Sequence, residues 1–211
     1  MVKTNLISAL SPESIPEAVR QSLRALANGG LIAFPTDTVY GLAAPAFDAQ
    51  GIDLLFQAKE RQTEKAIPVL VASLADLEKV TLNMPDHARK LAKHFWPGPL
   101  TLIVPRHPSL PENLSPLPTI GVRMPDHPIA LAILHASGPL AVTSANLSGF
   151  PSPSSAAQVL EQLNGRVDLI IDGGETFGGI PSTVVDCSEA SPKILRAGPL
   201  TQSDLDQALQ A

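Results

Sequence analysis

The sequence predicts one α/β domain built on a mixed β-sheet that is flanked by helices. Short continuous apolar runs, which are typical of buried strands, alternate along the chain with longer segments of helical periodicity. The alternation lacks strict strand–helix–strand regularity, which favours a mixed sheet over a purely parallel one. With 211 residues, 44% of them hydrophobic, the chain is long enough to bury one sizeable core.

The first third of the chain contains two expected helices and two expected strands. Residues 16–28 carry apolar side chains at helical spacing and end at a pair of glycines, which is a signal for the end of a helix. The apolar run 31–35 follows as a strand. A helix over 48–59 begins with Asp48 as its cap, and the continuous apolar run 66–72 is typical of a buried strand.

The remaining elements follow the same two patterns. Further helices are expected over 73–80, 85–95, 127–136, 154–163 and 202–210, and further strands over 100–105, 120–125, 139–145, 167–172 and 182–187. The chain has 21 prolines, and many of them stand at the ends of these elements, where they favour rigid turns.

Composition excludes several classes of protein. The net charge of −5 means that bulk electrostatics do not favour a polyanion as partner. A single cysteine, Cys187, excludes an internal disulfide and a cysteine-based metal cluster. No apolar run approaches the roughly 20 residues of a membrane helix, and the N-terminus lacks the apolar segment of a signal peptide, so a cytoplasmic location is expected. The common phosphate-loop, dinucleotide, zinc-protease and serine-hydrolase motifs are missing.

Polar side chains gather where four expected strands end. They occur at 36–38 (Thr-Asp-Thr), at Arg123, at 143–146 (Thr-Ser-Ala-Asn) and at 182–183 (Ser-Thr). Each group alone is typical of a turn or a helix cap. Because ligands bind beside strand ends in open α/β sheets, four such ends together predict a cleft lined with hydroxyls, an amide and a guanidinium.

Basic residues supply the candidate anion-binding groups. Lys59, Arg61 and Lys65 lie at or just beyond the end of an expected helix, where they either complement the helix dipole or clamp phosphate. Arg123 lies within a strand pattern, so its guanidinium must face solvent or find an anion such as a carboxylate. Arg196 precedes an Ala-Gly-Pro turn that could present its side chain across the cleft.

Seven short motifs then connect the chain with a known family. They are FPTDTVYGL (34–42), KER (59–61), WPGPLT (96–101), VRMPDHP (122–128), TSANLSG (143–149), PST (181–183) and LRAGP (195–199). In this order they resemble the YrdC-like family, whose members are L-threonylcarbamoyladenylate synthases. The resemblance covers residues 14 to 200 and implies a single YrdC-like domain over 1–211, with a twisted mixed sheet and a concave ligand cleft. It also implies the short form of the family, without the additional C-terminal domain.

The resemblance implies a nucleotidyltransferase. L-threonine, bicarbonate and ATP would give threonylcarbamoyl-AMP and pyrophosphate, and a separate tRNA threonylcarbamoyltransferase complex would pass the group to adenosine 37 of tRNA. Mg²⁺ is expected to arrive with the ATP phosphates, held by phosphate oxygens and water and not by dedicated protein ligands.

Family motifs also imply a role for each candidate residue. Thr36, Thr38, Arg123, Thr143 and Ser182 would bind threonine, whereas Lys59, Arg61, Thr63, Thr119, Ser144, Asn146 and Arg196 would bind ATP, with Lys59 and Arg61 as the catalytic pair. No motif supplies a clear general base.

Three points in the motifs stay open. Asp37 either orients Lys59 or a metal-bound water, or caps a turn. Gln62 replaces a proline that relatives often carry, and 65–67 reads Lys-Ala-Ile where they often read Lys-Pro-Leu. Neither change removes a charged group, so we expect altered loop geometry with the chemistry retained.

Two other functions were weighed against the synthase. A non-catalytic RNA-binding module could use the same basic cleft, and weak RNA binding is compatible with it. The acidic net charge, the aromatic content of 4% and the lack of a stacking platform argue against this function. The related carbamoyl-transfer domain of hydrogenase maturation proteins belongs to long chains with zinc-finger-like cysteines, and a single cysteine argues against it.

Overall fold

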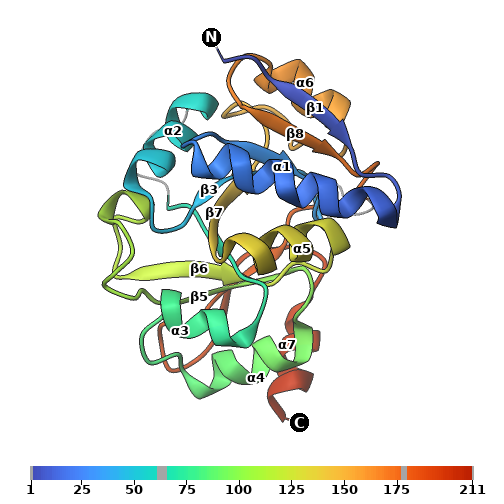
Figure 1. Cartoon of the computed structure of the whole chain (residues 1–211). Coiled ribbons are helices and arrows are strands. Elements are labelled where there is room, and N and C mark those ends of the chain that lie inside the picture. The colour runs from blue at the N-terminus through green and yellow to red at the C-terminus, as the bar shows by residue number, and fades with distance from the viewer. Residues whose placement is uncertain (1, 61–65, 177–179, 211) are drawn as a thin grey trace.

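The computed structural model describes residues 2–60, 66–176 and 180–210. Ten strands form one mixed sheet in the order β1-β8-β2-β3-β7-β4-β6-β5-β9-β10, with helices on both faces (Figure 1). The α/β fold with a mixed sheet that the sequence predicts is therefore confirmed.

The bounds of the elements are as follows. The strands are β1 (Asn5–Ser8), β2 (Ile32–Phe34), β3 (Gly41–Pro45), β4 (Val69–Leu70), β5 (Leu100–Pro105), β6 (Thr119–Arg123), β7 (Leu140–Ser144), β8 (Leu169–Asp172), β9 (Thr183–Asp186) and β10 (Lys193–Arg196). The α-helices are α1 (Ile15–Ala27), α2 (Ala49–Lys59), α3 (Leu77–Val80), α4 (Asp86–Phe95), α5 (Pro128–Ser137), α6 (Ala156–Leu163) and α7 (Gln202–Gln210). Short 3₁₀ turns lie at η1 (Pro12–Ser14), η2 (Leu74–Asp76) and η3 (Glu112–Leu114).

Two expected elements are shorter or more irregular than predicted. The helix expected over 73–80 is divided into η2 and α3. The apolar run 66–72 pairs with its neighbours only over Val69–Leu70, because Pro68 lacks the N–H that a central strand needs on both sides. Burial of the run was nevertheless expected correctly, since Ile67, Val69 and Val71 are all inaccessible to solvent.

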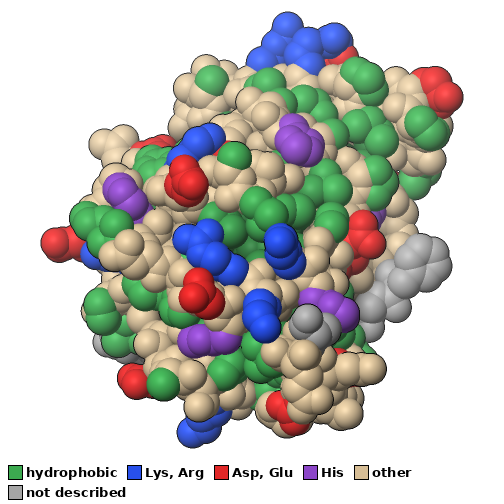
Figure 2. All heavy atoms as spheres, turned by 90° about the horizontal axis from the view of Figure 1, so that it is seen from below, with side chains coloured by type: hydrophobic (Ala, Val, Ile, Leu, Met, Phe, Trp, Pro, Cys, Tyr) green, Lys and Arg blue, Asp and Glu red, His purple; other side chains and the backbone are tan. Residues whose placement is uncertain are grey.

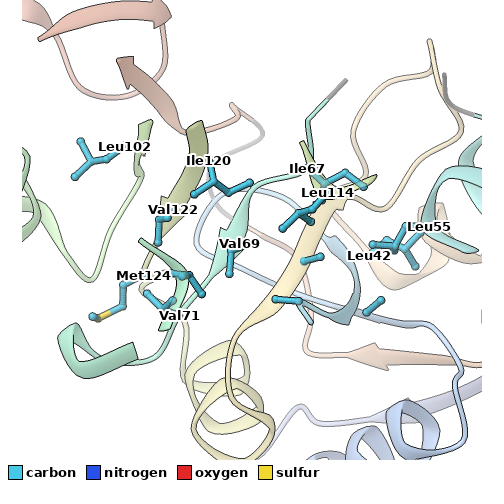
Figure 3. Close-up of a cluster of buried hydrophobic side chains, with 14 of the residues drawn as sticks. Leu42, Leu55, Ile67, Val69, Val71, Leu102, Leu114, Ile120, Val122 and Met124 are labelled. Carbon is cyan, nitrogen blue, oxygen red and sulfur yellow. The ribbon is translucent and has the colours of Figure 1, made fainter. Parts of the chain in front are cut away.

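The two faces of the sheet carry two apolar clusters. On one face, α1 and α5 pack against each other and over β8, β2, β3 and β7, with Ala18, Ile133, Phe34 and Val142 among the buried side chains. The larger cluster on the opposite face takes in residues from α2, α4, α6 and α7. Figure 3 shows part of it, where Val69, Val122 and their neighbours lie together.

The cover over the first face is incomplete. The cluster beneath α1 and α5 contains no residue of β5, β6 or β9 in the described part of the chain. Figure 1 agrees, since α1 and α5 lie over the upper strands and β5 and β6 emerge below them. The face of these strands is therefore free to line a cavity. Among the described residues, no helix combines the length and the apolar character needed to cross a membrane.

Candidate functional site

A cavity of about 340 Å³ lies on this uncovered part of the sheet. Its lining comes from segments that are far apart in the sequence: Thr36, Thr38, Val39, Tyr40, Gly41, Ala66, Pro68, Leu70, Thr101, Ile103, Gly121, Arg123, Val142, Thr143, Ser144, Ser152, Pro181, Ser182, Val184 and Arg196. All five residues that the motifs assign to threonine are in this set, together with Ser144 and Arg196 from the set assigned to ATP.

Strand alternation explains how the cavity is built. Successive side chains of a strand point to opposite faces, so residues two apart share a face. In β5, Thr101 and Ile103 line the cavity, whereas Leu100 and Leu102 belong to the opposite apolar cluster. Gly121 of β6 leaves the space open, because a Cβ atom there would lie 3.2 Å from the Cγ2 of Thr101.

The turn after β2 holds two hydroxyls in a fixed arrangement. The Thr36 hydroxyl donates to the carbonyl of Val39 at 2.7 Å and accepts from the backbone N–H groups of Thr38 and Val39. It also lies 3.0 Å from the Thr38 hydroxyl. Side-chain bonds of this kind stabilise turns, and here they fix both hydroxyls at the cavity wall.

Arg123, at the end of β6, is held from three directions and is only 6% exposed. Its Nε donates to the carbonyl of Gly98 at 3.0 Å, its Nη1 to the Thr38 hydroxyl at 2.9 Å, and its Nη2 to a carboxylate oxygen of Asp37. A guanidinium has five N–H groups, so two remain available for a ligand. Among the described residues, the carboxylate of Asp37 contacts Arg123 and the backbone N–H of Asp126.

A second cluster lies across the cavity. The Ser182 hydroxyl lies 2.7 Å from the hydroxyl of Thr101, and Arg196 donates to both the carbonyl and the hydroxyl of Ser182. Packing between Gly198 and residues 181–183 is so close that a Cβ atom on Gly198 would lie 2.3 Å from the backbone nitrogen of Thr183. The turn after β10 therefore holds Arg196 against Ser182.

The two arginines make the cavity electropositive. Burial lowers the pKa of the Arg123 guanidinium below its usual range, Asp37 opposes this shift, and the positive charge of Arg196 adds to it. Burial also lowers the pKa of Arg196. Two cations that disfavour each other's charge attract an anion into the space between them. Arg123 and Arg196 are therefore positioned for a ligand with at least one negative charge.

Lys59 and Asn146 lie beside the cavity lining and contact the loop after β7. Neither is among the residues that line the cavity. The Lys59 ammonium is buried and donates to the backbone carbonyls of Ser144 and Asn146. The Asn146 amide donates to the carbonyls of Leu147 and Phe150, at 2.8 Å each. In the described structure, both side chains hold the loop after β7 together.

Three further residues were expected to bind ATP: Thr119, Arg61 and Thr63. Thr119 is the first residue of β6, four residues and about 13 Å from Arg123, and it does not line the cavity. Arg61 and Thr63 lie outside the described residues.

Sequence reasoning missed two polar residues of the site. Thr101 is the last residue of the motif WPGPLT and stands inside an apolar strand, where its hydroxyl lies on the face opposite to the leucines. Tyr40 is fully buried, and its hydroxyl donates to the carbonyl of Gly174 at 2.6 Å. Burial raises the pKa of Tyr40 to about 12, so the phenol stays protonated at neutral pH.

The chain was compared with known proteins. A family model named for Sua5, YciO and YrdC and described as "Telomere recombination" matches residues 24–198. A Pyrococcus abyssi protein named threonylcarbamoyl-AMP synthase is 42% identical over 183 residues, which are 86% of this chain and 54% of that protein. A Mycobacterium tuberculosis relative is 39% identical over 207 residues, which are 98% of this chain and 95% of that protein.

A solved structure gives the same relationship in three dimensions. The crystal structure of Pyrococcus abyssi Sua5 complexed with L-threonine matches with a TM-score of 0.88 at 40% identity, and covers 99% of this chain and 60% of that chain. The chain thus spans little more than half of the Pyrococcus relative and nearly all of the Mycobacterium one.

Proposed function

Because the chain belongs to the Sua5/YciO/YrdC family, we propose that it is an L-threonylcarbamoyladenylate synthase that works within one domain. The observation that carries the proposal is the cavity itself, where a buried arginine among hydroxyls faces a second arginine. The name of the Pyrococcus relative supports this activity, and the relative solved with L-threonine has the same fold.

The amino acid would bind at Arg123. Two free N–H groups of its fixed guanidinium suit a carboxylate, which accepts paired hydrogen bonds. The hydroxyls of Thr38 and Ser182 can accept from the amino group of threonine or bond its side-chain hydroxyl. Thr36 and Thr143 belong to the same wall, where Thr36 holds the turn that presents Thr38. These groups are fixed before the ligand arrives, so binding costs little further ordering.

The nucleotide would enter beside Arg196. Arg196 and the Ser144 side of the loop after β7 would hold the phosphates, with Lys59, Arg61, Thr63, Thr119 and Asn146 as the further family positions. For Lys59 and Asn146 the described contacts favour a supporting role, in which they shape the loop that carries Ser144.

Chemically, the reaction needs positioning more than acid–base catalysis. The neutral threonine amine would form a bond to the carbon of bicarbonate, and loss of water would give a carbamate anion. A carbamate oxygen would then form a bond to the α-phosphorus of ATP while the bond to the β-phosphate oxygen breaks, and pyrophosphate would leave with that electron pair. Charge neutralisation and alignment can supply much of the rate in such steps.

Mg²⁺ would accompany the nucleotide. The described residues contain no group of three or more His, Cys, Asp or Glu side chains that could hold a metal ion. An ion carried on phosphate oxygens and water fits such a site, where it would neutralise phosphate charge.

The proposal extends to the surroundings of the enzyme. The product is a reactive mixed anhydride, so a tRNA threonylcarbamoyltransferase complex that uses it promptly, in the cytoplasm, is the expected partner. Non-catalytic RNA binding finds less support, because Tyr40, the one aromatic side chain among the described residues that line the cavity, is buried and offers no face for a base to stack on.

A dropout experiment tests the function. Purified protein is incubated with ATP, bicarbonate and threonine, each is omitted in turn, and pyrophosphate is measured. We expect release only when all three are present, together with threonylcarbamoyl-AMP detected by mass spectrometry. Pyrophosphate release that does not depend on threonine would reject the proposed acceptor.

A further inference from the structure

A second groove lies between the η2–α3 segment and α4. It has a volume of about 330 Å³ and is lined by Leu74, Leu77, Asp86, Arg89, Lys90, Ala92 and Lys93. None of these residues lines the cavity on the sheet. Figure 2, which views the molecule from below Figure 1, shows hydrophobic side chains at the centre of this face with Lys and Arg side chains beside them, interspersed with Asp, Glu and His.

The groove has an apolar floor and a basic wall. Leu77 and Ala92 are nearly inaccessible at its base, whereas Leu74 is 48% exposed at its edge. On α4, residues 86, 89, 90 and 93 follow the spacing of one helix face, which carries three cations and one carboxylate. Alanines and leucines on the other side of α4 pack into the core, so this basic face is turned to solvent.

The cations of this wall lack acidic partners. Within the described residues, no carboxylate lies within 4.0 Å of Arg89, Lys90 or Lys93. Arg89 and Lys90 donate only to the backbone carbonyls of Met84 and Leu209, at 3.2 and 3.3 Å. In a protein with a net charge of −5, three cations and the carboxylate of Asp86 thus lie on one helix face beside the exposed side chain of Leu74, and none of the cations forms an ion pair within the described residues.

From this arrangement we infer that the groove binds an acidic amphipathic segment of a partner protein, with apolar side chains on the floor and carboxylates against the α4 cations. A helix whose leucines face one way and whose glutamates flank them matches both features. Charge complementarity would also guide the encounter.

Two other occupants fit the groove less well. A nucleic acid would use the cations but leave the leucine floor uncovered, and the lining contains no aromatic side chain on which a base could stack. A second copy of this chain, packed by two-fold symmetry, would bring two cationic walls together. Each of these occupants predicts a different outcome in the test.

The probe is an acetylated and amidated peptide of about 18 residues, long enough to form a helix, with leucines on one face and glutamates beside them. The control is a peptide of the same composition in scrambled order. Binding of each labelled peptide to the full chain is measured by fluorescence anisotropy. Lys90→Glu/Lys93→Glu changes the wall, Leu74→Ser changes the floor, and Lys3→Glu/Arg24→Glu is the matched charge control on exposed residues elsewhere.

The amphipathic peptide should bind about tenfold more tightly than the scrambled one. Wall substitutions should remove that advantage, Leu74→Ser should weaken binding about threefold, and the control pair should leave it within about twofold. All variants should keep threonine-dependent pyrophosphate release, since the groove is separate from the cavity, so this binding test succeeds or fails independently of the proposed activity.

Three results would overturn the inference. One is equal affinity for the two peptides. Another is weak binding of the amphipathic peptide together with binding of an RNA hairpin that Lys90→Glu/Lys93→Glu abolishes. The third is self-association in sedimentation that Lys90→Glu/Lys93→Glu abolishes.

Discussion

Arg123 is a buried cation whose burial is compensated by hydrogen bonds. A guanidinium that is 6% exposed would be strongly disfavoured without partners, and it has a carbonyl, a hydroxyl and a carboxylate. Asp37 accepts from it with one oxygen and, with the same oxygen, from the backbone N–H of Asp126 at 3.1 Å. The pair is therefore fixed before any ligand binds.

Arg123→Ala should weaken the binding of threonine by about 1.5–3 kcal/mol, which is the usual contribution of a hydrogen bond to a charged group. The expected result is a rise of roughly 10- to 150-fold in KM for threonine, with KM for ATP little changed. Arg24→Ala, on an exposed face of α1, is the control. An unchanged threonine dependence would remove Arg123 from this role.

Asp37→Asn tests whether the carboxylate positions Arg123. The substitution keeps the shape of the side chain but removes its charge, so the guanidinium keeps only two of its three acceptors at full strength. We expect KM for threonine to rise by about tenfold while kcat at saturating threonine stays near that of the parent. Asp37→Glu should restore part of the loss. If kcat and stability fall while both KM values rise, Asp37 has only a structural role.

Lys59→Met separates two roles of a buried ammonium. Because the ammonium donates to backbone carbonyls of Ser144 and Asn146, its loss should lower the free energy of unfolding by about 1–3 kcal/mol. KM for ATP should rise as the loop loosens. Denaturant unfolding and kinetics are measured on the same sample, and unchanged stability with impaired ATP use would identify a direct phosphate contact.

At the scale of elements, the site depends on how β9, β10 and the following turn pack. Gly198→Ala would push a methyl group against the backbone of Ser182 and Thr183, where the nearest atoms lie at 2.3 and 2.6 Å. We expect a loss of about 1–3 kcal/mol in the free energy of unfolding and a rise in both KM values, because Ser182 and Arg196 move apart. Ala197→Ser, at the exposed neighbour, should change neither quantity.

The same scale shows why parts of the fold could be read from the sequence and others could not. Helices such as α1 and the long buried strands were predictable, because their apolar periodicity extends over many residues. Three strands were missed. β3 reads Gly-Leu-Ala-Ala-Pro and lacks β-branched residues, and β1 and β10 are short edge strands of low burial whose pairing depends on distant partners.

Site residues divide in a similar way. The motifs led to Thr36, Arg123 and Ser182, and the structure brings them to one cavity. No local pattern indicates that the ammonium of Lys59 is satisfied by carbonyls 85 and 87 residues away. Such contacts arise from the folded chain as a whole, so only coordinates reveal them.

At the scale of the whole molecule, the dependence of stability on pH should include a contribution from His127. Burial lowers the pKa of this histidine below its usual value, although Asp37 and Asp126 oppose the shift. The imidazole of His127 therefore takes up a proton near pH 6.5 in the unfolded chain but only at lower pH in the folded chain. As a result, the free energy of unfolding should fall as the pH drops below about 6.5. Unfolding curves between pH 8 and 5 should be flatter for His127→Gln, and parallel curves would show that the shift is absent.

The order of strands in the sheet has a consequence for how the chain folds during its synthesis on the ribosome. Arg123 and its hydroxyls are made in the first two thirds of translation, whereas β9 and β10 bring Ser182 and Arg196 only near the end. β9 must then insert beside β5, a strand synthesised some eighty residues earlier. An unfinished chain consequently lacks one wall of its pocket, so the ligand site is completed only when synthesis is nearly done.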